Sequence, residues 1–315
     1  MDVFETFSSV FMLLCSILGV VSAIIFIGIV ICSRRCRTMT ILLVLNSTVA
    51  NLIINSVCGS QAIYQLASDG NDRLCELRGF FIHLGTSLLY HTLCVQALHR
   101  LFVTVLARQR YLQSTRVIIC LVILQWLMSL GLCLPMLLTG RIVYHPKSRI
   151  CQVAMSDLFV LLGLAAFVYL CPLIWIALVY IQIVRYAKYN ISITIRRCLV
   201  QKQQREIRLI RRILTLFGIL FIMGFPYFVF FLMVQFTQSP APSYGLRLSF
   251  VFLSFGYGIC PLLNLLYTDD SIDQSADETH TKNETPTKPA RNVKKHRRHS
   301  SYLSYVYPHG YYDGQ

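Results

Sequence analysis

Long apolar segments alternate with short polar segments from the start of the chain to residue 267. A stretch of about 20 apolar residues crosses the roughly 30 Å hydrocarbon core of a membrane as a helix, because a helix satisfies its backbone hydrogen bonds without water. Seven segments meet this requirement: residues 8–32, 40–64, 75–107, 116–138, 156–185, 207–235 and 244–267. The pattern therefore predicts an all-α membrane protein, a seven-transmembrane helix bundle.

The basic residues between the spans predict which side of the membrane each loop occupies. The loops richest in Lys and Arg are those near 33–39, 108–116 and 185–206. The loops almost free of Lys and Arg are those near 65–74 and 236–243. Short loops with an excess of these residues stay in the cytoplasm, so the N-terminus is predicted to be extracellular and the C-terminus cytoplasmic. One loop, 139–155, is discordant because it carries three basic residues.

The two ends of the chain differ from the apolar spans. Residues 1–7 contain Asp2 and Glu5 and no basic residue, whereas a cleaved signal peptide begins with basic residues. They are predicted to be a short extracellular segment before a span that is retained. Residues 268–315 are polar with blocks of charge, which is typical of a disordered tail. The membrane domain is therefore predicted to cover residues 8–267, followed by a disordered cytoplasmic tail.

Composition supports a membrane protein and argues against a nucleic-acid partner. Hydrophobic residues make up 55% of the chain and charged residues 14%, against about 25% charged residues in soluble domains. The formal net charge is +15, but most basic residues lie in short loops and in the tail. Such charge indicates membrane topology and attraction to anionic lipid.

Two of the 12 cysteines, Cys75 and Cys151, lie at the predicted outer face. An oxidising compartment permits a disulfide there. The bond would tie the outer end of the third span to the loop after the fourth; the alternative is two free thiols. The other ten lie in apolar spans or on the cytoplasmic side, where they are interpreted as small buried hydrophobic residues.

A charged residue, Arg100, lies inside the third span, 25 residues after Cys75. At 1.5 Å per residue this is about 37 Å of helix, which places Arg100 near the cytoplasmic face. A charge within a span is costly and indicates a functional role with a partner. The predicted partner is Glu206, at the base of the sixth span. The alternative is an arginine that extends to the interface without a defined partner.

Several residues, taken in order, resemble landmarks of the rhodopsin-like (class A) G-protein-coupled receptors over about residues 8–268. Cys75 and Arg100 have the spacing of the helix-three cysteine and of the arginine in the Asp-Arg-Tyr motif. Glu206 falls where many members have the acid that pairs with this arginine. The tryptophan of helix four, the proline and tyrosine of helix five, and the prolines of helices six and seven correspond to Trp126, Pro172, Tyr180, Pro226 and Pro261.

The chain departs from the family pattern at several of these landmarks. The Asp-Arg-Tyr triplet reads His99-Arg100-Leu101, and Asn51 replaces the sodium-binding aspartate of helix two. The residues before Pro226 are Met223-Gly224-Phe225, without the tryptophan that the family has there, and the Asn-Pro-x-x-Tyr motif ends in Asn264. These differences place the chain among divergent members of the family, and neither a cofactor nor a metal ion is expected.

The resemblance implies that an extracellular ligand drives the cytoplasmic end of helix six outward. This movement would break the Arg100–Glu206 contact and open a site for a heterotrimeric G protein. The residues expected to carry coupling are Arg100, Glu206, Tyr180 and His99.

The resemblance also places the ligand among the outer halves of helices three, five, six and seven. The candidate pocket residues are His83, Ser87, Tyr227 and Tyr257, for which ordinary packing is the alternative. The outer half of the third span has no acid, so a carboxylate that binds an amine is not predicted. The ligand is expected to be a peptide or a small molecule of unknown class.

Other classes of membrane protein are less consistent with the spans. A transporter requires ionisable groups near the middle of the membrane, where the spans offer His91 and several amides. A retinal protein requires a Schiff-base lysine, and residues 244–267 contain no lysine. No arrangement of nucleophile, metal ligands or paired acids indicates an enzyme. The chain is predicted to be a plasma-membrane receptor; the alternative is a seven-helix transporter or channel-like protein without G-protein coupling.

Overall fold

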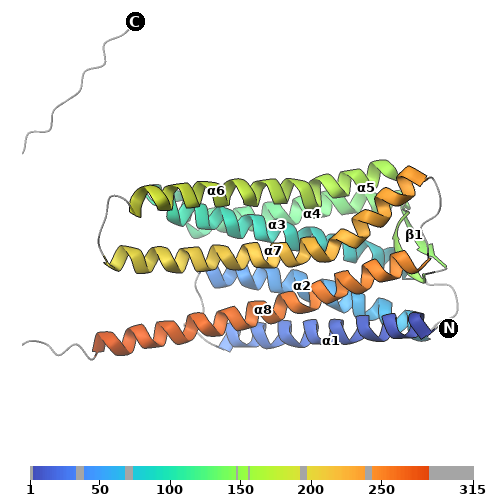
Figure 1. The fold of residues 1–315 in the computed structure, drawn as a ribbon, viewed down its shortest axis with the longest axis horizontal. Coiled ribbons are helices and arrows are strands. Elements are labelled where there is room, and N and C mark those ends of the chain that lie inside the picture. Colours follow the sequence, from blue (N-terminus) through green and yellow to red (C-terminus); the bar gives the residue numbers. More distant parts are fainter. Residues whose placement is uncertain are drawn as a thin grey trace, which may run out of the picture. The chain divides into compact units, whose positions relative to one another are not determined.

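The computed structural model shows a bundle of long helices with a short β-hairpin at one end (Figure 1). It describes residues 3–32, 39–67, 74–146, 148–154, 157–191, 197–237 and 243–283. Within these ranges, only the backbone is described for residues 187–191, 197–209, 243 and 268–283. The chain divides into two compact units, Met1–Asp273, which contains the bundle, and Gln274–Gln315.

Seven membrane helices follow one another along the chain. The first four are α1 (Val3–Cys32), α2 (Met39–Ala67), α3 (Cys75–Thr104) and α4 (Thr115–Leu138). The fifth consists of α5 (Leu158–Leu164), a π-helical segment (Ala165–Leu170) and α6 (Cys171–Ile191). The sixth and seventh are α7 (Arg197–Thr237) and α8 (Ser243–Asn283). The prediction of a seven-helix bundle is therefore confirmed.

Six of these helices are long and apolar enough to cross a membrane. The seventh, α3, is not among these six, and it packs against α2, α4, α6 and α7 and against both strands. Its side chains therefore face other parts of the protein more than lipid. The outer helices instead present large apolar side chains such as Ile24, Leu127 and Phe225, which are about half exposed. Such a surface is suited to lipid.

Pro172 interrupts the regular geometry of the fifth helix. Proline has no N–H group, and its ring clashes with the carbonyl group four residues earlier. The residue four positions earlier is Val168, inside the π-helical segment Ala165–Leu170, whose wider turn accommodates the proline. The span predicted at 156–185 is thus one helix in three parts.

The seventh helix extends further than its apolar span. The predicted span 244–267 agrees with the apolar part of this helix, Tyr244–Tyr267, and the helical backbone of α8 continues beyond it to Asn283. No glycine or proline lies between Tyr267 and Asn283 to end it. The helical backbone therefore continues into the first part of the predicted tail, and residues 284–315 of that tail lie outside the described residues, so its disorder stays a prediction.

The hairpin consists of β1 (Ile142–His145) and β2 (Ile150–Val153), which pair antiparallel. A disulfide joins Cys151 of β2 to Cys75, the first residue of α3, as predicted. Gly79 allows the close approach of the strands to α3, because a Cβ there would lie 3.2 Å from the carbonyl oxygen of Cys151. The end of the bundle that carries this hairpin is called the hairpin end, and the opposite end is called the arginine end.

Two arginines of the hairpin end form ion pairs. Arg141, in the loop whose basic charge was discordant, pairs with Asp157 at 2.7 Å. Arg247, near the start of α8, pairs with Glu5 in the first turn of α1 at 3.4 Å. The first pair connects the two ends of the segment between α4 and α5, and the second connects α8 to α1. Both pairs therefore link separate parts of the hairpin end.

Candidate functional site

Arg100 lies buried near the end of α3, with only 6% of its surface exposed. Its Nη2 donates a hydrogen bond to Oγ1 of Thr40 at the start of α2, at 3.0 Å. Cys75 and Arg100 occupy the two ends of α3, so the disulfide and the buried arginine lie at opposite ends of the bundle. The spacing of 25 residues thus separates them by almost the whole length of α3, and the cytoplasmic position of Arg100 stays a prediction.

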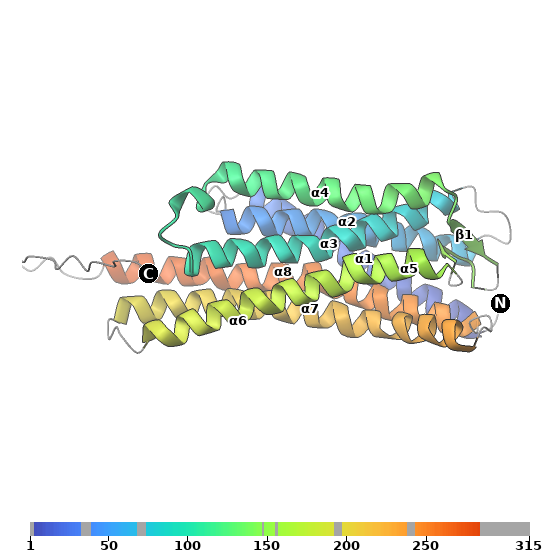
Figure 2. The same ribbon diagram turned by 90° about the horizontal axis from the view of Figure 1, so that it is seen from above.

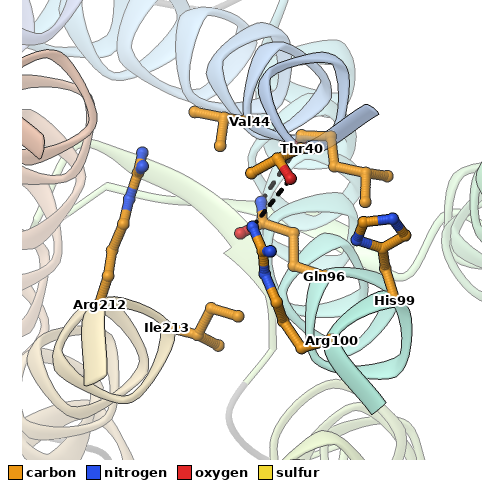
Figure 3. Close-up of a pocket in the computed structure, with 8 residues that line it drawn as sticks. Thr40, Val44, Gln96, His99, Arg100, Arg212 and Ile213 are labelled. Atoms are coloured by element: carbon orange, nitrogen blue, oxygen red, sulfur yellow. Dashed lines mark hydrogen bonds between the residues drawn. The ribbon is translucent and has the colours of Figure 1, made fainter. Parts of the chain in front are cut away.

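Arg100 lines a cavity formed by α2, α3 and α7 (Figure 3). The residues that line it are Thr40, Leu43, Val44, Gln96, His99, Arg100, Arg212 and Ile213. In the figure Arg100 extends toward Thr40, while Arg212 extends from α7 on the other side of the cavity. Two guanidinium groups therefore lie close to one polar cavity at the arginine end.

The other predicted coupling residues surround Arg100 to different degrees. His99 is 5% exposed, and its Nδ1 has no hydrogen-bond partner among the described residues. Tyr180 of α6 is partly exposed and lines a neighbouring cavity that also contacts Arg100. Glu206 belongs to α7, but its side chain lies outside the described residues. The ion pair between Arg100 and Glu206 therefore stays a prediction.

Arg212 lies near the start of the span predicted at 207–235, and the structure places it inside the bundle at 6% exposure. Its Nη2 donates hydrogen bonds to Oδ1 of Asn264 at 2.8 Å and to the carbonyl oxygen of Asn264 at 3.4 Å. The signal in the sequence is its four-residue spacing from Leu216 and Leu220, which are also buried. Residues at this spacing lie on one face of a helix, whereas the adjacent Arg211 is exposed.

The four predicted ligand-pocket residues lie toward the hairpin half but do not share one hydrogen-bonded network. The hydroxyl of Tyr257 and Oγ1 of Thr86 are 2.8 Å apart, joining α8 to α3. Tyr227 accepts a weaker hydrogen bond from Gln152 of β2 at 3.4 Å. Ser87 instead points to α4, where its Oγ bonds that of Ser129 at 3.0 Å.

His83, the fourth candidate, is partly buried, and its buried Nε2 has no partner among the described residues. None of the four residues lines either of the two described cavities, which lie at the arginine end. Tyr227 and Tyr257 are therefore better placed to share a ligand than Ser87, because they connect α7, α8, α3 and the hairpin.

Two helix landmarks have clear structural roles. Nε1 of Trp126 in α4 donates to Oδ1 of Asn46 in α2 at 3.0 Å. Asn46 in turn donates to Oγ1 of Thr92 in α3 at 3.1 Å, so these three side chains join three helices. Asn51 is fully buried and donates to the carbonyl oxygen of Ser47. Pro135, Pro226 and Pro261 lie inside α4, α7 and α8.

The features of a seven-helix receptor are thus present: seven membrane helices, a disulfide from the third helix to the hairpin after the fourth, and a buried arginine at the other end of the third helix. The family described as 7 transmembrane receptor (rhodopsin family) matches residues 22–264. The chain belongs to this family, whose members are receptors rather than enzymes.

Comparison of structures agrees with this assignment. The crystal structure of squid rhodopsin superposes with a TM-score of 0.76 and 17% sequence identity, covering 92% of this chain and 93% of squid rhodopsin. At this identity the likeness concerns the fold alone. Among curated proteins, none matches the chain in sequence.

Proposed function

We propose that this receptor converts the binding of an extracellular ligand into activation of a heterotrimeric G protein. The observation that carries the proposal is Arg100, a buried charge at the edge of a cavity formed by α2, α3 and α7. A charge in a membrane helix is costly to keep without a function. A cavity walled by separate helices also changes shape when one of those helices moves.

The hairpin end is extracellular in this proposal. The Cys75–Cys151 disulfide supports this orientation, because disulfides persist in an oxidising compartment. The excess of Lys and Arg in the loops near 33–39, 108–116 and 185–206 supports a cytoplasmic position for the arginine end. Those loops would also lie against anionic lipid of the inner leaflet.

Activation is proposed to move the cytoplasmic end of α7 away from α3. Arg212 and Ile213 of α7 form one wall of the cavity beside Arg100, so this movement would open the cavity toward the cytoplasm. The opened cavity would admit part of a G-protein α-subunit, with Arg100, His99 and Tyr180 at its edge. Such a two-state change needs a ligand that binds the open state more tightly.

The ligand is proposed to bind among the outer halves of α3, α7 and α8 and the hairpin. Tyr257 and Tyr227 are the favoured contacts because their hydroxyl groups already connect these elements. A ligand that replaced either hydrogen bond would change how α7 and α8 pack at the hairpin end. His83 and Ser87 stay secondary candidates.

The experiment that tests the proposal measures G-protein dissociation in cells exposed to libraries of peptides and small molecules. The parent chain is compared with Arg100→Ala and with Arg108→Ala, a control at an exposed arginine beyond α3. We expect a ligand to activate the parent and the control, and Arg100→Ala to lose the response at equal surface expression. A response that survives in Arg100→Ala contradicts the role given to Arg100.

A further inference from the structure

We propose that Arg212, Asn264 and Ser47 form a latch that holds the cytoplasmic half of α7 against α8 and α2 in the resting receptor. The three residues are called the latch below. The proposal rests on the outward movement of α7 proposed above, and it identifies residues that oppose this movement in addition to the predicted Arg100–Glu206 pair.

The latch is a chain of hydrogen bonds through three helices. Arg212 of α7 donates to Oδ1 of Asn264 in α8 at 2.8 Å and to its carbonyl oxygen at 3.4 Å. Nδ2 of Asn264 donates to Oγ of Ser47 in α2 at 3.3 Å. The hydroxyl of Ser47 donates to the carbonyl oxygen of Val44 at 2.9 Å. The guanidinium of Arg212 is thus connected through Asn264 to the backbone of α2.

Burial makes these hydrogen bonds important for Arg212. The exposed fractions of Arg212, Asn264 and Ser47 are 6%, 2% and 1%. A buried charge is unfavourable unless polar groups replace the water that it loses, and hydrogen bonds from a charged donor are the stronger kind. The Tyr267 ring adds to this stabilisation, with the Arg212 Cζ 5.5 Å from its centroid. Arg212 therefore favours the arrangement in which α7 contacts α8.

The partner helix of the latch, α8, is also hydrogen-bonded to α2 and α3. Nδ2 of Asn55 in α2 donates to the carbonyl oxygen of Tyr257 in α8 at 3.0 Å. The hydroxyl of Tyr257 is also hydrogen-bonded to Thr86 of α3. Since α8 is joined to both α2 and α3 closer to the hairpin end, Arg212 connects α7 through α8 to these two helices.

Movement of α7 by a small angle would break the latch. Arg212 lies 14 residues before Pro226, which corresponds to about 21 Å of helix. Figure 1 shows α7 bending in its second half, the half that contains Pro226. A swing of about 10° around this region would displace Arg212 by about 4 Å, and a hydrogen bond of 2.8 Å does not survive such a displacement.

The latch also accounts for one departure from the family pattern. Asn264 stands three residues after Pro261, where the Asn-Pro-x-x-Tyr motif has its tyrosine. The shorter amide leaves room for a side chain from α7 and supplies both an acceptor for Arg212 and a donor for Ser47. In this chain Asn264, hydrogen-bonded to Arg212, therefore stands at the position of the motif's tyrosine.

The test measures the position of α7 directly in purified receptor in lipid nanodiscs. Spin labels are introduced as unnatural amino acids at two exposed positions, Thr215 on α7 and Arg116 on α4, so that the native cysteines stay. The distance distribution is recorded for the parent, Arg212→Met, Asn264→Leu and Ser47→Ala. The matched control is Arg211→Met, at the adjacent exposed arginine.

We expect Arg212→Met and Asn264→Leu each to raise the ratio of open to closed receptor by about tenfold, the effect of one lost charge-assisted hydrogen bond. Ser47→Ala should have a smaller effect of the same sign. The double variant Arg212→Met/Asn264→Leu should resemble the single variants, because both remove the same bond. Arg211→Met should leave the distribution as in the parent.

An unchanged distribution in Arg212→Met overturns the latch, as does a change of equal size in Arg211→Met or strict additivity in the double variant. Thermal unfolding of each variant identifies those that fold poorly, and Arg212→Lys, which retains the charge, should restore part of the closed population. G-protein activation by the same variants is measured separately. Variants that open without G-protein activation support the latch and contradict the proposed function. A parent that activates the G protein, with variants that do not open, supports the proposed function and contradicts the latch.

Discussion

From the ion pair between Glu5 and Arg247 we predict that removing the acid lowers the stability of the receptor more than removing the base. Arg247 is only 2% exposed, and its Nη2 lies 3.4 Å from Oε1 of Glu5, whose side chain is 24% exposed. Glu5→Gln would leave a buried guanidinium without its carboxylate. Arg247→Met removes the buried charge itself, and the released carboxylate is able to reach water.

The expected magnitudes follow from this difference in burial. Removing one partner of a fully buried pair costs ~3–5 kcal/mol. Water compensates part of this cost at Glu5, which leaves about 2 kcal/mol for Glu5→Gln. Replacement of Arg247 by methionine should cost less than about 1 kcal/mol, because an apolar side chain in place of a buried charge is often neutral. Ser8 and Ser9 continue to satisfy the carbonyl oxygen of Glu5, which Arg247 also contacts.

Thermal unfolding in detergent, followed with a thiol-reactive dye, measures these effects. The dye reports unfolding when it reaches buried cysteines such as Cys58, Cys133 and Cys260. About 2 kcal/mol corresponds to a decrease of about 4 °C or more in Tm for Glu5→Gln. The double variant Glu5→Gln/Arg247→Met should be close to Arg247→Met alone. A larger decrease for Arg247→Met than for Glu5→Gln, or additive effects, refutes the reasoning.

Three further outcomes are expected. Replacing Cys75 and Cys151 together by serine should lower the free energy of unfolding by about 2–5 kcal/mol, and a reducing agent should lower the Tm of the parent but not of this variant. Burial lowers the pKa of His145 below its ordinary value of 6.5. Just below pH 6.5, His145 is therefore protonated in the unfolded chain and neutral in the folded chain. Stability should therefore fall as pH decreases from 6.5 toward the folded pKa; His145→Gln should show a flatter pH profile, and an equal slope in both proteins contradicts this cause. A glycosylation sequence inserted at residues 68–73 should be glycosylated in cells, whereas the glycosylation sequence already present at Asn190-Ile191-Ser192 should not be. The reverse pattern overturns the proposed orientation.

The helices of the bundle were largely predictable because the requirement that produces them is local. Each apolar segment must be long enough to cross the membrane and must satisfy its own backbone hydrogen bonds. Seven helices were found at the predicted places, and the disulfide followed from the same topology. The spacing of Cys75 and Arg100 also placed the arginine correctly at the opposite end of α3.

Hydrophobicity alone does not predict how far the seventh helix continues beyond its apolar span, Tyr244–Tyr267, or the shape of the fifth helix. Hydrophobicity reports where a helix leaves the apolar layer, whereas the helix itself continues until a residue or a contact ends it. The π-helical segment Ala165–Leu170 was likewise not predicted. A proline such as Pro172 is consistent with an irregular turn in the preceding helix, but it does not specify the geometry of that turn.

Contacts between helices depend on how each helix is rotated about its axis and on which neighbours it meets. Arg211 and Arg212 are adjacent and chemically identical, yet one is exposed and the other binds Asn264 inside the bundle. The spacing placed Arg100 at the end of α3 opposite Cys75, but its contact with Thr40 required the packing of α2 against α3. Depth in the membrane is encoded in the order of residues along one helix, whereas the partner of a buried charge is set by the side chains that other helices bring to it.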